Sequence, residues 1–145
     1  MIRSRGFPAS VSPLFLFERD APLKGHSAYK QAKAGDGDAA LALVIDRAVA
    51  WLYEKRDRFE PGLVFIAPHA KEATGDNAIP QTLASVCAAI YQGSTDTEVV
   101  QSDRVYHTGA DPMERMAARA QFQGQIVSGA QYVLVDDVTS LGGTL

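Results

Sequence analysis

Two short apolar runs, each next to turn-forming or charged residues, constrain the fold of this chain more than any other feature. The first is Leu63–Ala67, which follows Pro61 and Gly62, and the second is Tyr132–Val135, which leads directly into two aspartates. Continuous apolar runs of this length are typical of strands buried on both faces of a parallel sheet. We therefore predict that the first run is a central strand and that the second is another buried strand.

Helical signals alternate with these runs along the chain. We predict helices over Ala28–Ala34, from the caps Asp36 or Asp38 to about Arg58, over Ile79–Tyr91, and from Asp111-Pro112 onward. Weaker strand signals lie at Val99-Val100 and Val105-Tyr106. Helices that alternate with apolar strands indicate an α/β fold, with a parallel sheet flanked by helices.

Composition limits the classes of protein to which the chain can belong. It has 145 residues, of which 46% are hydrophobic and 21% charged, as expected for one ordinary globular domain. Its formal net charge is −3, so it carries no excess of positive charge that would favour nucleic acid or anionic lipid. We therefore expect small-molecule partners, no nucleic acid and no membrane.

Targeting and redox signals are weak. The single cysteine, Cys87, cannot form an intramolecular disulfide, and no apolar run approaches the roughly 20 residues of a bilayer span. The stretch Phe7–Phe17 follows Arg3 and Arg5, yet prolines interrupt it and no small-residue cleavage site closes it. We expect a cytoplasmic protein.

The N-terminal part of the chain lacks the regular helix and strand patterns of the rest. Met1–Pro22 carries three prolines and no clean period, which predicts an extended arm, with Leu14–Phe17 as a candidate edge strand. We expect residues 1–60 to form an arm and helical cap, and residues 61–145 to form the core, within one structural domain.

The residues after the second strand carry the clearest chemical signal. Ligands of α/β sheets bind at the carboxyl ends of the strands, where Asp136 and Asp137 stand here. Paired carboxylates can hold sugar hydroxyls or a hydrated Mg²⁺, and the glycine- and hydroxyl-rich loop that follows can turn N–H groups toward a phosphate. This loop comprises Thr139, Ser140, Leu141, Gly142, Gly143 and Thr144.

The segment Tyr132–Thr144 resembles the phosphoribosyl pyrophosphate (PRPP) motif of type I phosphoribosyltransferases, which has hydrophobic residues, two acids and a Thr/Gly loop. The resemblance implies that Asp136 and Asp137 contact the ribose hydroxyls and a metal ion, and that residues 139–144 hold the 5′-phosphate. Leu141 departs from the family pattern, because Thr or Ala is more usual there.

A looser likeness lies upstream. Leu63–Ala67 and the following Pro68–Lys71 are similar to the first core strand and pyrophosphate loop of ComF-type members of that family, although Thr74-Gly75 stands where those carry Arg-Gly. The resemblance implies a transferase that binds PRPP or a nucleoside 5′-monophosphate. With Lys71 and Mg²⁺ on the leaving pyrophosphate, the phosphoribosyl group would pass to a nitrogen acceptor.

Other functions and states are open at this point. The alternative within the resemblance is a non-catalytic PRPP or nucleotide sensor or regulator, and a further class is an interaction domain in which the motif is incidental. Because no helix follows the loop, we expect a fragment that is truncated after it, or a chain completed by a partner. A homodimer is an expectation that the sequence leaves open.

Each candidate residue also has a simpler interpretation. The aspartate pair could cap the turn that follows the strand, and His69 is as consistent with a strand-end cap as with a site residue. Cys87 and Trp51 lie in apolar helical stripes and are expected in the core. Asp36 and Asp38 fit helix capping better than a calcium loop, which needs further ligands.

Overall fold

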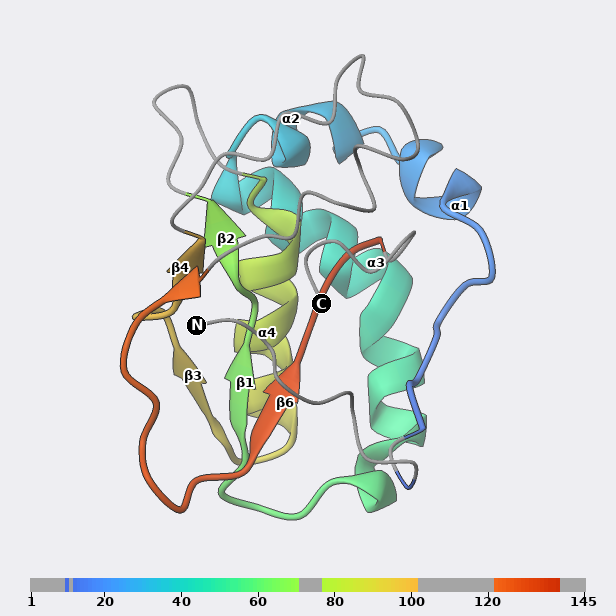
Figure 1. The fold of residues 1–145 in the computed structure, drawn as a ribbon. Helices are drawn as coiled ribbons and strands as arrows, with labels where there is room; N and C mark the ends of the chain where they lie inside the picture. The colour runs from blue at the N-terminus through green and yellow to red at the C-terminus, as the bar shows by residue number, and fades with distance from the viewer. Residues whose placement is uncertain (1–9, 11, 71–76, 102–121, 139–145) are drawn as a thin grey trace.

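A computed structural model of the chain describes residues 10, 12–70, 77–101 and 122–138. Its centre is a three-stranded parallel sheet in the order β3 (Ser94–Asp96), β1 (Val64–Ile66), β6 (Tyr132–Leu134), with helices packed against it (Figure 1). Phe65 lies in register with Thr95 on one side and Val133 on the other. The predicted α/β class and both predicted strands are confirmed, with β1 in the centre of the described sheet and the half-buried β6 at its edge.

Helix α4 (Ile79–Ile90) packs on β1 and β3, and α3 (Gly37–Glu54) packs on α4. Helix α2 (Tyr29–Lys33) packs on α3, α1 (Ala21–Lys24) contacts α2, and a 3₁₀ turn, η1 (Arg56–Arg58), follows α3. In Figure 1, α4 lies behind the sheet and α3 runs beside α4. The Asp36 side chain accepts a hydrogen bond from the Ala39 N–H at 3.0 Å and so caps α3. The helix bounds predicted around residues 28–34, 36–58 and 79–91 agree closely with α2, α3 and α4.

The core lies between the sheet and helices α2, α3 and α4. It gathers side chains that are at most 9% exposed: Ala32, Ala40, Leu43, Val44, Ala48, Leu52, Phe65, Ala67, Ile79, Ala84, Cys87, Ala88, Tyr91 and Val135. Cys87 is among them, and burial raises the pKa of its thiol to about 12, as expected of a core residue. Trp51 is half-buried and packs against this cluster, as predicted.

Three aromatic rings join the end of α4 to the sheet. Tyr91 stacks on Phe59 with ring centroids 4.5 Å apart, and Phe65 contacts both rings at 5.8 and 6.0 Å. The buried Tyr91 hydroxyl donates a hydrogen bond to the Leu52 carbonyl oxygen on α3 at 2.6 Å. Burial raises the pKa of Tyr91 to about 12, so the phenol keeps its proton and can donate this bond.

A second small sheet lies beyond the carboxyl end of β1. It contains β2 (His69–Ala70), β4 (Val100–Gln101) and β5 (Phe122–Gln123), with β2 parallel to β4 and β4 antiparallel to β5. Gly124, which follows β5, has φ +144°, and a Cβ there would lie 2.7 Å from the Glu98 carbonyl oxygen. Only glycine fits this close approach of two backbones.

Some sequence predictions differ from the structure. Residues Leu14–Phe17 form no strand, although Leu16 packs against the core, and α1 follows where an extended arm was predicted. Strand β3 was missed because Ser94–Asp96 is polar; it forms because β1 offers a free backbone edge beside it. The signals at Val105-Tyr106 and Asp111-Pro112 lie outside the described residues.

Replacing Gly93 with alanine should destabilise the fold. A Cβ at Gly93, between α4 and β3, would collide with the Leu63 carbonyl oxygen and lie 2.9 Å from Cε2 of the buried Phe65 ring. We expect Gly93→Ala to lower the free energy of unfolding by about 1–3 kcal/mol in urea denaturation. Gly37→Ala is the control, because a Cβ there meets nothing within 4 Å; equal stability of the two variants would contradict the packing argument.

Candidate functional site

The candidate site begins where β6 leaves the sheet. The Val135 N–H donates to the Ile66 carbonyl oxygen at 2.8 Å, which is the last bond that joins β6 to β1. Asp136 and Asp137 follow at once and therefore lie at the carboxyl edge of the parallel sheet. This is the place that the sequence predicted for them, and the edge where α/β folds commonly bind ligands.

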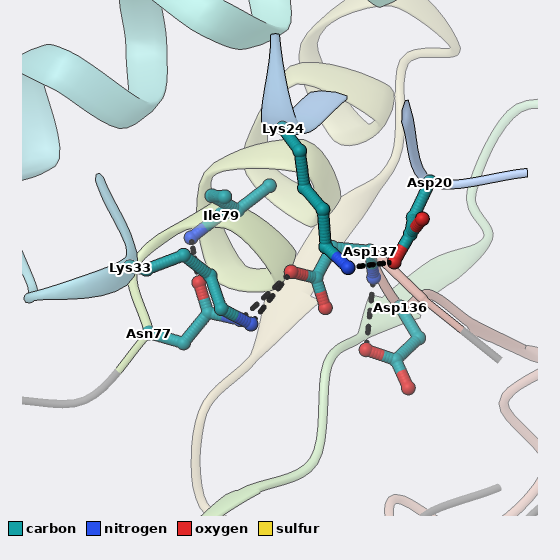
Figure 2. Close-up of polar contacts among 7 residues, drawn as sticks. All are labelled: Asp20, Lys24, Lys33, Asn77, Ile79, Asp136 and Asp137. Carbon is teal, nitrogen blue, oxygen red and sulfur yellow. Dashed lines mark hydrogen bonds and ion pairs between the residues drawn. The ribbon is translucent and has the colours of Figure 1, made fainter. Parts of the chain in front are cut away.

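Asp137 is a buried carboxylate with two partners. Its side chain is 5% exposed, and its Oδ2 accepts hydrogen bonds from Lys33 Nζ at 3.1 Å and from Asn77 Nδ2 at 2.9 Å (Figure 2). Lys33 is the last residue of α2, and Asn77 precedes α4. A carboxylate with so little exposure to water needs hydrogen-bond partners, and Lys33 and Asn77 provide them.

Asn77 also organises the start of α4. Its Oδ1 accepts a hydrogen bond from the Ile79 N–H at 3.2 Å, and the neighbouring Ala78 N–H donates to the Ala32 carbonyl oxygen of α2 at 3.0 Å. One side chain therefore contacts the first turn of α4 and the carboxylate after β6. These bonds join α2, α4 and β6 at a single point of the carboxyl edge.

Asp136 lies in a different environment from Asp137. Its Oδ1 accepts a hydrogen bond from the Asp137 N–H at 2.8 Å, and the side chain is partly buried. Burial, and after it the charge of Asp137, raise the pKa of Asp136 to about 6, while Lys33 opposes the shift. Asp136 therefore changes protonation state near neutral pH and can either accept or donate a hydrogen bond.

The predicted Mg²⁺ site at Asp136 and Asp137 stays a prediction, and the contacts of Asp137 do not favour it. Oδ2 of Asp137 already accepts bonds from Lys33 and Asn77, and the Lys33 ammonium would repel a cation at this oxygen. Within the described ranges, no three His, Cys, Asp or Glu side chains are grouped so that they could hold a metal.

An open cavity lies elsewhere at the same edge. It has a volume of about 370 Å³ and is lined by residues of α4, such as Thr82 and Ser85, and by Thr95 and Asp96 of β3. Neither Asp136 nor Asp137 lines it, and the Asp96 carboxylate already accepts bonds from the Tyr132 hydroxyl and the Glu98 N–H, each at 2.8 Å. The candidate site is therefore defined by the charged cluster and not by this cavity.

Only part of the predicted site can be placed. Lys71 and Thr139–Thr144 lie outside the described residues, so the structure brings together Asp136 and Asp137 alone among the predicted site residues. Lys33 and Asn77 were missed, since they lie 104 and 60 positions from Asp137. The only sequence signals for these two residues were that Lys33 lies at the end of a predicted helix and that Asn77 lies just before another.

Comparisons with known proteins give two relatives. The chain is similar to Protein TraN of Escherichia coli. The two are 37% identical over 121 residues, and an uncharacterized protein of Haemophilus influenzae is 30% identical over 122 residues. These matches cover 81% and 83% of this chain but 27% of each relative, so the chain spans about a quarter of their length. No protein-family model and no solved structure matches the chain.

These findings correct the phosphoribosyltransferase assignment. The relatives carry the names TraN and uncharacterized protein, and no phosphoribosyltransferase model matches. The transferase function and its PRPP or nucleotide sensor alternative were therefore wrong. The prediction depended on one short segment at the end of a strand. Two acidic residues before a glycine-rich turn also occur where acidic side chains cap a strand end and glycines allow a tight turn.

The described helices also bear on membrane insertion. In the part of the chain that the structure places, none of the helices combines the length and the apolar content that a membrane span requires.

The raised pKa of Asp136 predicts a pH-dependent stability. The unfolded carboxyl loses its proton near its usual pKa of 3.8, whereas the folded one keeps it until about 6. Stability from this group is therefore complete below about pH 4 and lost as the pH rises through about 6. We expect a loss of about 1–3 kcal/mol over that window, measured by urea unfolding at several pH values.

Asp136→Asn should flatten this profile and leave the protein more stable than the wild type near neutral pH. Asp57→Asn, at an exposed position in η1, is the control and should keep the wild-type slope. Parallel profiles for wild type and Asp136→Asn would show that Asp136 titrates normally in the folded protein.

Proposed function

We propose that this chain is a ligand-binding module of a longer protein related to TraN, and that its site is the charged cluster at the carboxyl edge. The proposed ligand is a polar small molecule whose hydroxyl or amino groups donate hydrogen bonds to Asp136. The position of the cluster at the end of a parallel strand supports this proposal, and so does the chain's share of its relatives' length.

One observation carries the proposal. Lys33 neutralises Asp137 at 3.1 Å, while the partly buried Asp136 beside it has no cation of its own among the described residues, and its pKa rises to about 6. A group held in an environment that opposes its charge lowers the stability of the fold. Such unfavourable groups are concentrated at functional sites, where the ligand supplies the missing interaction.

The two aspartates would have different roles. Asp137 is fixed by Lys33 and Asn77, and its N–H in turn donates to Asp136 Oδ1 at 2.8 Å, which orients that carboxyl. In this proposal the ligand donates a hydrogen bond to the carboxyl of Asp136, which also has a side-chain contact with Asp137. A carboxyl held in place by its neighbours loses little conformational freedom on binding, which favours recognition.

The cluster also supports a second interpretation, a purely structural tie. Asn77 contacts both α4 and Asp137, and Lys33 brings in α2, so these contacts stabilise the packing of three elements whether or not a ligand binds. The two interpretations differ in Asp136, which a structural tie does not need.

The test is a titration followed by ¹H–¹⁵N NMR, with myo-inositol as a neutral probe that carries vicinal hydroxyls and with MgCl₂ as a second probe. We expect myo-inositol to shift the amide signals of residues 136 and 137 with weak, millimolar saturation. Asp136→Asn should weaken binding at least about fivefold, as expected for one hydrogen bond to a charged group.

Two further variants separate binding from folding. Asp57→Asn should bind like the wild type, whereas Asp137→Asn should lower thermal stability because Lys33 loses its partner. Equal shifts in the wild type and Asp136→Asn would remove the proposed ligand contact. An absence of shifts with myo-inositol would leave the structural tie as the better interpretation, and shifts with MgCl₂ alone would contradict the ligand class.

A further inference from the structure

Helix α3 has two apolar faces, and only one of them packs into the core. The core face consists of Ala40, Leu43, Val44, Ala48 and Leu52, all buried. Four further apolar residues, Ala42, Ile45, Val49 and Tyr53, lie on a different side of the helix, which we call the outer face of α3. Ile45 is 55% exposed and Tyr53 is 53% exposed.

The outer face forms a straight stripe along the helix. Its residues recur at intervals of three and four, the spacing that keeps side chains on one side of an α-helix and lets two helices pack lengthwise. Asp38 lies in α3 four positions before Ala42, and Arg56 lies in η1, just after the end of α3 and three positions after Tyr53. The apolar stripe therefore has an acidic residue at its N-terminal end and a basic residue at its C-terminal end.

We propose that the outer face of α3 packs against the same face of a second copy of this chain, with the two helices antiparallel. The proposed register places Ile45 against the partner's Val49, and by symmetry Val49 against the partner's Ile45. A two-fold axis then crosses the helix near its middle, and each copy contributes the same surface, as expected for a closed dimer.

Charge complementarity is the reason for choosing a second copy as the occupant. The same register brings Asp38 beside the partner's Arg56 at both ends of the interface. Asp38 has no side-chain hydrogen bond or ion pair with any residue that the structure describes, whereas Asp46 already contacts Arg47 at 3.2 Å. Arg56 uses one N–H to bind the Tyr53 carbonyl oxygen at 3.2 Å and keeps four other donors.

The size of the surface sets the expected affinity. One face of an 18-residue helix is about 27 Å long and offers much less area than the roughly 800 Å² per partner of a standard interface. We therefore expect a weak dimer, with a dissociation constant on the order of 10–100 μM.

Sedimentation velocity of the 145-residue chain over a wide concentration range tests the dimer. We expect the weight-average sedimentation coefficient to rise with concentration, and Ile45→Glu to raise the dissociation constant at least about tenfold. Ile126→Glu is the matched control, because Ile126 is 60% exposed in the segment between β5 and β6, and it should dimerise like the wild type. Circular dichroism checks that both variants remain folded.

Charge reversal tests the register. Asp38→Lys and Arg56→Asp should each weaken self-association, because each homodimer then juxtaposes like charges twice. An equimolar mixture of the two variants restores opposite charges at both ends and should associate like the wild type. A wild type that stays monomeric at all concentrations, or equal effects of Ile45→Glu and Ile126→Glu, would overturn the proposal, and failure of the mixture to associate would overturn the register.

Discussion

The buried charge of Asp137 is the constraint around which the carboxyl edge of this protein is arranged. A carboxylate that is 5% exposed needs partners within hydrogen-bond distance, and these come from Lys33 on α2 and from Asn77 at the start of α4. Because Asn77 also binds the Ile79 N–H, the position of α4 depends on the same side chain. Satisfying one charge thus fixes where two helices meet the central sheet.

Asp136 shows what this arrangement leaves unsatisfied. Lys33 forms its ion pair with Asp137 and not with Asp136. Because Asp136 is partly buried and lies beside the charge of Asp137, its pKa rises to about 6. The fold tolerates this cost because the central sheet and the aromatic contacts of Phe59, Phe65 and Tyr91 provide stability elsewhere. The proposed ligand-binding role of Asp136 follows from that imbalance and not from any enclosed cavity.

The proposed ligand site and the proposed dimer use different surfaces of the molecule. The charged cluster follows β6, whereas the dimer would form on the side of α3 that does not pack into the core. Both surfaces belong to a chain that spans about a quarter of the length of the relatives it matches. Each proposal can fail without affecting the other.

The sequence by itself determined the local structure: the apolar runs that form β1 and β6, the capped amphipathic segments of α2, α3 and α4, and the position of two aspartates at a strand end. These follow from residue patterns over a few turns. The sequence was misleading at Tyr132–Thr144, where thirteen residues suggested an enzyme family. It also did not reveal β3, whose polar residues form a strand only because β1 lies beside them. Only the tertiary structure decided that Lys33 and Asn77 join Asp137, because contacts across 104 and 60 positions depend on packing and leave no periodic signal in the chain.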